Sequence, residues 1–237
     1  MQRLVVSIDA VARLAAAAAG RSDFDLAAAA SLAGLGGAAA VRASVAEDLR
    51  PIGESEVLHL RRVSRGLELR VAAQPSLLKT VLEARPDRVV IAGESWDGEA
   101  GAAPLDLRTQ ARDVQPMLRA LEEAGIDAAL LVAPDIASVK AGHKLGARGL
   151  ELFTGATVDL PREERVAALD QLGDAGRLAS KLRLRVSLAG SLDDLTLPEV
   201  LARVPSAECV AVGRAFSSRA LLVGVERAVR DLRALLG

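Results

Sequence analysis

The chain has 237 residues, of which 51% are hydrophobic and 26% are charged, and its formal net charge at pH 7 is −1. A chain with this apolar content can bury a substantial core, which excludes an intrinsically disordered protein. The near-zero net charge and the 2% aromatic content argue against nucleic-acid binding, because a basic field and rings for base stacking are both lacking. The longest uncharged apolar runs, residues 14–20 and 128–134, are shorter than the roughly 20 residues of a membrane span.

The cysteine count and the N-terminal residues further narrow the class of protein. The single cysteine, Cys209, excludes an internal disulfide and a cysteine zinc site, and we expect neither a metal nor a cofactor. The opening Met-Gln-Arg-Leu-Val-Val-Ser-Ile-Asp lacks the charged, apolar and small-residue order of a signal peptide. We therefore expect a soluble, cytoplasmic globular protein with no membrane or nucleic-acid partner.

Short β-branched runs alternate with longer segments of helical spacing along the whole chain. The runs predict eight strands, at residues 4–8, 38–45, 67–71, 88–92, 128–132, 150–153, 184–188 and 209–212. Helical spacing follows at residues 55–63, 77–84, 114–124, 136–145, 163–182 and 220–236. Glycine and proline mark the joints between these segments.

This alternation predicts right-handed βαβ crossovers and hence a parallel sheet. Eight such units in 237 residues match the size of a closed (β/α)8 barrel, and we predict a single domain over residues 1–237. A doubly wound open sheet is the alternative, which eight repeats disfavour. The glycine-rich segment 98–104 follows the fourth strand and is either a lid over the barrel mouth or a variable surface loop.

Common catalytic motifs are absent from the sequence. His59 and His143 fall inside predicted helices, so we interpret them as helix-surface or packed residues. No G-x-S-x-G, H-E-x-x-H, Walker loop or strand-linked G-x-G-x-x-G occurs, and the glycines of residues 34–37 indicate a turn that ends a helix.

Polar residues at the C-terminal ends of the predicted strands are the remaining candidates, because this is the catalytic end of such barrels. Asp9 ends the first strand, and Glu151 and Thr154 lie at the end of the sixth. The loops after the last two strands are where these barrels commonly bind a phosphate on N–H groups and a helix N-terminus. The residues there are Gly190, Ser191, Gly213 and Arg214. A loop without a ligand is the alternative interpretation.

Six segments, in order along the chain, carry a family resemblance. Residues 150–155 (Leu-Glu-Leu-Phe-Thr-Gly) match I-E-x-H-T-G, and residues 7–12, 43–52 and 121–126 match N-I-D-H-x-A, V-H-L-R-E-D-x-R-H-I and L-A-D-A-G-I. Residues 188–192 and 211–220 are similar to N-A-G-H-G-L and N-I-G-H-A-I-I-G-R-A. With these motifs the chain resembles the pyridoxine 5′-phosphate synthase family, barrel enzymes of vitamin B6 biosynthesis.

The resemblance implies a (β/α)8 barrel that condenses 1-deoxy-D-xylulose 5-phosphate with 3-amino-2-oxopropyl phosphate. That reaction needs several proton transfers, and therefore histidines and a glutamate at the barrel mouth. The family's catalytic glutamate falls at Arg70, and alanines at 15–19 replace its arginine-bearing stretch, leaving Arg13 or Arg21 as candidate substitutes. The family's histidines fall at Ser44, Pro51, Ser191 and Arg214.

Three functional hypotheses follow. We favour a non-catalytic member of the family, a scaffold or regulator that still binds a phosphate, because serine and proline do not titrate near pH 7. The second hypothesis is an altered reaction on a related phosphorylated substrate that uses Asp9, Glu151 and Arg70, and the third is the family reaction itself. Arg70 discriminates between them: pairing with Asp9 or Glu151 indicates a remade pocket, whereas a pocket filled by alkyl side chains indicates a scaffold.

The resemblance also implies self-association, because the family forms octamers built from dimers. Two alanine-rich segments, residues 15–19 and 27–33, carry small side chains that permit close approach of helices. We therefore expect a homo-oligomer based on dimers.

Overall fold

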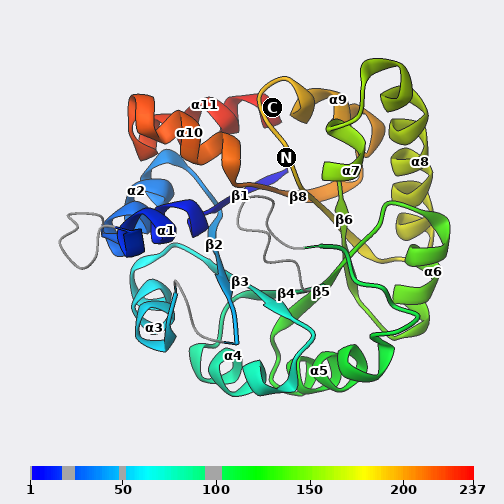
Figure 1. The fold of residues 1–237 in the computed structure, drawn as a ribbon, viewed down its shortest axis with the longest axis horizontal. Coiled ribbons are helices and arrows are strands. Elements are labelled where there is room, and N and C mark those ends of the chain that lie inside the picture. The colour runs from blue at the N-terminus through cyan, green and yellow to red at the C-terminus, as the bar shows by residue number, and fades with distance from the viewer. Residues whose placement is uncertain (1, 18–24, 48–51, 94–102) are drawn as a thin grey trace.

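The computed structural model describes residues 2–17, 25–47, 52–93 and 103–237. Eight parallel strands close into a barrel in chain order, with β8 paired to β1. Helices ring the barrel on its outside (Figure 1). The strands are β1 (Arg3–Ser7), β2 (Ala40–Val45), β3 (Leu67–Ala72), β4 (Arg88–Ala92), β5 (Asp127–Val132), β6 (Gly149–Phe153), β7 (Arg185–Ala189) and β8 (Ala207–Val212). The predicted (β/α)8 barrel is confirmed, and the open-sheet alternative is wrong.

The helical segments connect successive strands on the outside of the barrel. They are α1 (Asp9–Ala17), α2 (Leu26–Gly36), α3 (Glu54–Val63), α4 (Leu78–Ala84), α5 (Ala111–Glu123), α6 (Ile136–Lys144), α7 (Gly155–Val158), α8 (Arg162–Lys181), α9 (Thr196–Arg203), α10 (Arg214–Val223) and α11 (Val225–Arg233). Short 3-10 turns, η1 (Pro75–Leu77) and η2 (Ala234–Leu236), precede α4 and follow α11. Among the described residues, no helix is both long and apolar enough to cross a membrane.

Local sequence explains how α2 begins and ends. The Asp25 carboxylate accepts a hydrogen bond from the Ala27 N–H at 2.8 Å, which satisfies one of the free donors of the first turn. At the other end Gly37 adopts a left-handed conformation with φ +99°, which glycine reaches without steric cost. The turn predicted for residues 34–37 is therefore confirmed as the end of a helix.

The C-terminal helical segment differs from the prediction of one helix over residues 220–236. The structure has two helices there, because α10 already begins at Arg214 and ends at Val223. Gly224, with φ +84°, separates α10 from α11. Helix α9 lies outside the predicted helical segments, because Pro198 is one of the prolines that indicate a joint between segments. That proline lies in the first turn of α9, where its missing N–H would have no intrahelical partner.

The predicted lid or loop at residues 98–104 lies, apart from Ala103 and Pro104, outside the described residues. Pro51, Arg21 and the last residues of the alanine run 15–19 are likewise outside them. Ala103 forms an antiparallel bridge with Gly93, so the chain returns to the end of β4 before it enters α5.

Apolar side chains form the core between the barrel and its helices, and smaller clusters lie among the inward-facing residues of the strands. One of these clusters contains Val5, Ala189, Cys209 and Ala211, and another contains Val90, Ala92, Ala129 and Leu131. The barrel also buries charged residues, since Arg42, Glu68 and Glu151 are no more than 2% exposed. Because a buried charge is costly unless it is paired, the centre of the barrel must hold compensating partners.

Candidate functional site

A ladder of alternating charge crosses four neighbouring strands of the barrel. The strand register sets Arg42 of β2 beside Glu68 of β3, Glu68 beside Arg88 of β4, and Arg88 beside Asp127 of β5. Arg42 Nε donates a hydrogen bond to Glu68, and Arg88 Nη1 lies 3.5 Å from Glu68 Oε2. Opposite charges on directly facing strand positions stabilise a sheet, and here they also neutralise one another inside the barrel.

Glu151 of β6 completes this buried network from the other side of the barrel. Arg42 Nη1 donates to Glu151 Oε1 at 2.8 Å, and Arg42 Nη2 donates to Glu151 Oε2. Burial, the largest single influence, would raise the pKa of Glu151, but the charge and hydrogen bonds of Arg42 together with the charges of Arg88 and Arg70 outweigh it, and the pKa is lowered. Burial alone would likewise lower the pKa of Arg42, but Glu151 and Glu68 raise it. Both groups are therefore ionised and hydrogen-bonded to each other.

Asp9, the first residue of α1, lies above this network at the C-terminal end of the barrel. Its carboxylate accepts hydrogen bonds from Ser44 N and Ser44 Oγ, each at 2.7 Å, and from Ser7 Oγ at 2.8 Å. Arg70 Nη2 donates a further hydrogen bond to Asp9 at 3.2 Å, and Arg70 Nε donates to Ser44 Oγ at 2.9 Å. The Asp9 carboxylate thus receives four hydrogen bonds and holds Arg70 in place.

Arg70 stands where the resemblance puts a glutamate, so its positive charge needs a partner at the barrel mouth. Arg70 pairs with Asp9, and its charge is compensated at the barrel mouth. Burial lowers the pKa of Arg70, and the charge of Asp9 offsets part of that effect. An arginine remains protonated in a protein, so Arg70 is a permanent cation here. Because Arg70 pairs with Asp9, the arrangement indicates a remade pocket and not one filled by alkyl side chains.

A cavity of about 620 Å³ lies at this mouth, between α1 and the loops that follow β7 and β8. Its volume is typical of small-molecule sites, which span roughly 300–1,000 Å³. Leucines contribute to the walls, but charged and hydroxyl groups also line it, so the mouth is not filled by alkyl side chains. Polar side chains on the walls include Asp9, Arg13, Arg70, Ser191, Arg214 and Ser217.

Asp9, Arg70, Glu151 and Thr154 were candidates for one polar pocket, but two of them lie elsewhere. Glu151 is fully buried at the centre of the barrel and does not line the cavity, because both its oxygens are bound to Arg42. Thr154 is also fully buried, and its Oγ1 donates a hydrogen bond to the Gly190 carbonyl. The structure therefore brings Asp9 and Arg70 together at the mouth and separates Glu151 and Thr154 from them.

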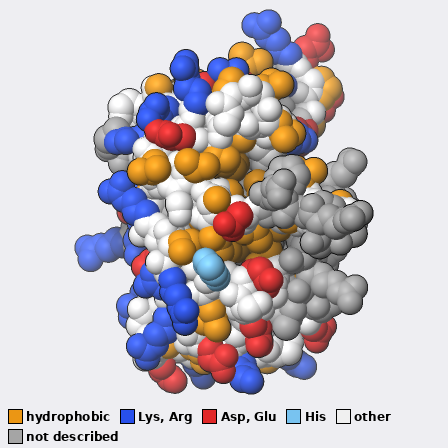
Figure 2. Space-filling model, turned by 90° about the vertical axis from the view of Figure 1, so that its left-hand side faces the viewer, with side chains coloured by type: hydrophobic (Ala, Val, Ile, Leu, Met, Phe, Trp, Pro, Cys, Tyr) orange, Lys and Arg blue, Asp and Glu red, His pale blue; other side chains and the backbone are white. Residues whose placement is uncertain are grey.

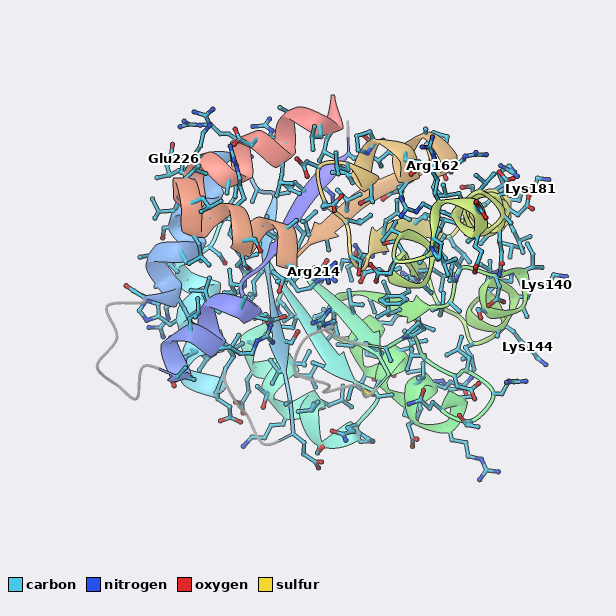
Figure 3. All side chains as sticks on the ribbon, turned by 45° about the horizontal axis from the view of Figure 1, so that its top comes forward. Lys140, Lys144, Arg162, Lys181, Arg214 and Glu226 are labelled. Atoms are coloured by element: carbon cyan, nitrogen blue, oxygen red, sulfur yellow. The ribbon has the colours of Figure 1, made fainter. Side chains whose placement is uncertain are left out.

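All four residues of the predicted phosphate site, in contrast, line the same cavity. These residues are Gly190, Ser191, Gly213 and Arg214. Gly190 has φ +116°, and a Cβ there would approach Gly155 N and the Phe153 ring to 2.7 Å. Backbone geometry therefore requires this glycine whether or not a ligand is bound. Figure 3 shows Arg214 near the centre of the ring of helices, whereas Lys140, Lys144, Arg162 and Lys181 lie at its periphery.

The side chains of these loops are held by a carboxylate that the sequence did not reveal. Ser191 Oγ donates to Asp159 Oδ2 at 2.7 Å, and Arg214 Nη2 lies 3.9 Å from Asp159 Oδ1. Ser217, in the first turn of α10, has a buried hydroxyl oxygen with no hydrogen-bond partner in the described part of the chain. A group entering the cavity must therefore compete with Asp159 for Ser191 and Arg214, and it reaches the buried Ser217 hydroxyl only when that side chain turns toward the cavity.

Groups that titrate near neutral pH do not line this cavity in the part of the chain that the structure describes. His59 in α3 and His143 in α6 are exposed on the outer helices, where they were predicted. Cys209 is buried in the barrel, and burial raises its pKa to about 12. Within the described ranges, no group of three or more His, Cys, Asp or Glu side chains is placed to hold a metal ion. The described walls of the mouth carry guanidinium, hydroxyl and carboxylate groups but no imidazole or thiol.

Comparisons with known proteins agree with the sequence motifs. The profile of a family described as "Pyridoxal phosphate biosynthesis protein PdxJ" matches residues 4–237. A pyridoxine 5′-phosphate synthase from a Synechococcus species is 34% identical over 239 residues, covering 100% of this chain and 99% of the relative. A second protein of that name, from a Synechocystis species, is 33% identical over 240 residues, again covering 100% and 99%.

Solved structures with a similar fold are more distant in sequence. A 3-hexulose-6-phosphate synthase from Salmonella typhimurium superposes with a TM-score of 0.61 at 16% identity, covering 98% of each chain. A phosphoribosyl anthranilate isomerase from Thermotoga maritima gives a TM-score of 0.61 at 11% identity, covering 97% of this chain and 96% of that one. At these identities the likeness supports the barrel fold alone.

Proposed function

The chain belongs to the family of the pyridoxal phosphate biosynthesis protein PdxJ, and from this premise we propose that it binds a phosphorylated ligand without forming pyridoxine 5′-phosphate. The observation that carries the proposal is the Arg70–Asp9 pair. The resemblance puts the catalytic glutamate of the family at Arg70, which is a cation hydrogen-bonded to Asp9 and Ser44. A permanent cation cannot abstract a proton, and Asp9 already accepts four hydrogen bonds.

Phosphate binding is the part of the proposal that the loops after β7 and β8 support. Arg214 brings a permanent positive charge to the cavity, and it stands at the first position of α10, where the N–H groups and the helix dipole favour an anion. The buried hydroxyl of Ser217, without a partner in the described chain, lies one turn further along the same helix. Ser191 adds a second hydroxyl, which is released when Asp159 gives way.

The same observations weigh against a pure scaffold and against an altered reaction. A scaffold needs no cavity, yet the mouth has one of about 620 Å³ with charged walls. An altered reaction that uses Asp9, Glu151 and Arg70 needs a carboxylate that can exchange protons with a substrate. Asp9 is saturated with donors, and Glu151 is buried beneath the cavity. Ligand binding, with a regulatory role, fits these constraints best.

The activity test uses protein from a host that lacks its own synthase. We expect no pyridoxine 5′-phosphate above the uncatalysed background when 1-deoxy-D-xylulose 5-phosphate and 3-amino-2-oxopropyl phosphate are supplied. Losing one general acid or base typically lowers the rate by 10²–10⁴. In this chain, the positions that match several of the family's catalytic residues hold side chains that cannot take over proton transfer. Arg70→Glu restores one carboxylate but no imidazole, so we expect that variant to be inactive as well. Steady turnover by the unaltered protein would contradict the proposal.

We further propose that the chain self-associates through the face formed by α1, α2 and α3. This face carries exposed leucines at positions 32, 35 and 58, of which Leu35 is 70% exposed. Figure 2 shows hydrophobic side chains gathered on this side of the molecule. A contiguous apolar patch on a water-soluble domain is typical of an interaction surface, which supports a second copy as the partner.

A further inference from the structure

We propose that the barrel mouth binds a carboxylate at Arg70, so that the ligand is a small phosphorylated carboxylic acid. This inference rests on the proposed phosphate site and assigns the second acidic group of the same ligand. Two features carry it: the orientation in which Arg70 is held, and the engagement of the neighbouring hydrogen-bond donors by Asp9.

Among the described residues, hydrogen bonds occupy one edge of the Arg70 guanidinium. Nε donates to Ser44 Oγ at 2.9 Å, and Nη2 donates to Asp9 Oδ2 at 3.2 Å. Nη1 makes no hydrogen bond to the described residues, although Arg70 lines the cavity. The remaining edge consists of Nη1 and the second hydrogen of Nη2, which together form two parallel donors. This geometry matches the two oxygens of a carboxylate.

The surroundings of Arg70 favour a carboxylate over a second phosphate. A phosphate group has three oxygens to satisfy, and protein phosphate sites commonly supply backbone N–H groups and hydroxyls for them. Near Arg70 the hydroxyls of Ser7 and Ser44 and the N–H of Ser44 all donate to Asp9. The guanidinium edge is then the principal donor left, and two donors suffice for a planar acid.

Arg70 is also held rigidly before any ligand arrives. Its side chain is 17% exposed, and the Asp9 side chain that holds it is 9% exposed. A buried, oriented guanidinium loses little side-chain entropy when it binds, and the low local dielectric strengthens its interaction with an anion. Its burial and its fixed orientation distinguish Arg70 from the exposed arginines on the outer helices.

Charge balance supports an anion at this end of the cavity. Arg42 also lines the cavity, but all three of its nitrogens donate to Glu68 and Glu151. Arg70 is balanced by Asp9, and Arg214 lies near Asp159. Arg13 lines the same cavity and has no carboxylate partner within the described ranges. Arg13 therefore leaves the walls with one positive charge in excess, which favours an anion in the cavity.

The test compares matched pairs of probes by calorimetry at fixed ionic strength. The first pair is 3-phosphoglycerate and glycerol 3-phosphate, and the second is 4-phosphoerythronate and erythritol 4-phosphate. Within each pair the phosphate is the same and only the terminal carboxylate differs. We expect the acid to bind about ten-fold or more tightly than its alcohol in at least one pair, as a charged bidentate hydrogen bond provides.

Substitutions assign the preference to Arg70. Arg70→Met should bring the acids to the affinity of the alcohols and leave the alcohols unchanged, whereas Arg214→Ala should weaken all four probes. Arg70→Lys keeps the charge but not the paired donors, so it should recover only a small part of the preference. Melting temperatures check that each variant is folded.

The unaltered protein decides the matter even if Arg70→Met does not fold. Equal affinity for acid and alcohol in both pairs would overturn the carboxylate site and leave the phosphate proposal standing. Binding of none of the four probes would overturn both. A preference for the acids that persists unchanged in Arg70→Met would also refute the assignment to Arg70.

Discussion

Arg70 Nη2 lies 3.2 Å from Asp9 Oδ2 at the barrel mouth, and the exposed fractions of the two side chains are 17% and 9%. Asp9 belongs to α1 and Arg70 to β3, so this pair ties the first helix to the wall of the barrel. The strand register places Ser44 of β2 beside Arg70, and Ser44 hydrogen-bonds both partners. A cation at position 70 is tolerated because the Asp9 carboxylate and the Ser44 hydroxyl both accept hydrogen bonds from it.

Asp9→Asn should destabilise the protein by about 3 kcal/mol, because it leaves Arg70 nearly buried without a counter-charge. Asp9→Asn combined with Arg70→Met removes both charges, and we expect it to cost less than the sum of the single changes. Urea unfolding of the two single variants and the double variant measures this coupling. Strict additivity would mean that the two side chains do not interact in solution.

Glu151→Gln should cost about 3 kcal/mol at pH 7, since it breaks a fully buried pair with Arg42. The folded-state pKa of Glu151 is lowered below that of the unfolded chain, about 4.3. The carboxylate therefore contributes stability above that value and loses it as the pH falls through the lowered pKa. Urea unfolding between pH 7 and pH 3 should show the gap between the two proteins narrowing at the acid end.

Glu122→Gln is the matched control for this experiment. Glu122 pairs with Arg148 on the surface, where the two side chains are 54% and 73% exposed. Exposed pairs contribute roughly 0–1 kcal/mol, so this variant should unfold almost like the unaltered protein. A cost at Glu122 equal to that at Glu151 would mean that burial does not set the energetics of these pairs.

The sequence was sufficient to predict the barrel, because the strands are short apolar runs and those after β1 have glycine or proline near at least one end. All eight predicted strands are present and differ from the structure only by one or two residues at their ends. The helices were harder to predict where composition hides their limits. Pro198 marks the first turn of α9, and Gly224 divides a continuous helical pattern into α10 and α11.

The site was only partly predictable, because its partners come from distant parts of the chain. Asp9 and Arg70 were candidates, but nothing local indicates that Ser44 would join them. Arg42, Glu68 and Arg88 were missed, although each is a charge within a predicted strand. Residues 42 and 44, like residues 68 and 70, share one strand face, so this spacing was the available signal. Asp159 gave no signal, since only the folded loops bring it to Ser191.

Asp159→Asn should raise the affinity for inorganic phosphate by about ten-fold, because it removes an internal anion that holds the donors. Asp159 accepts from Ser191 Oγ at 2.7 Å and lies 3.9 Å from the Arg214 guanidinium. A phosphate in the cavity must displace it from both. Calorimetry at constant ionic strength measures the change. Asp170→Asn, which removes an exposed carboxylate paired with Arg203, controls for net charge and should leave the affinity unchanged. Weaker binding in Asp159→Asn would show that this carboxylate supports the site.

Leu35→Glu should convert an oligomer into the 24.6 kDa monomer, because it puts a charge into the apolar face of α1, α2 and α3. Burying an unpaired carboxylate in an interface is costly, whereas in a monomer the same side chain would simply be solvated. Leu195→Glu is the matched control, since Leu195 is 80% exposed at the start of α9, away from that face. Sedimentation velocity over a range of concentrations should show a mass of at least two chains for the unaltered protein and for Leu195→Glu, and a single chain for Leu35→Glu. A single 24.6 kDa species in the unaltered protein would exclude self-association, and an oligomer that survives Leu35→Glu would exclude this face.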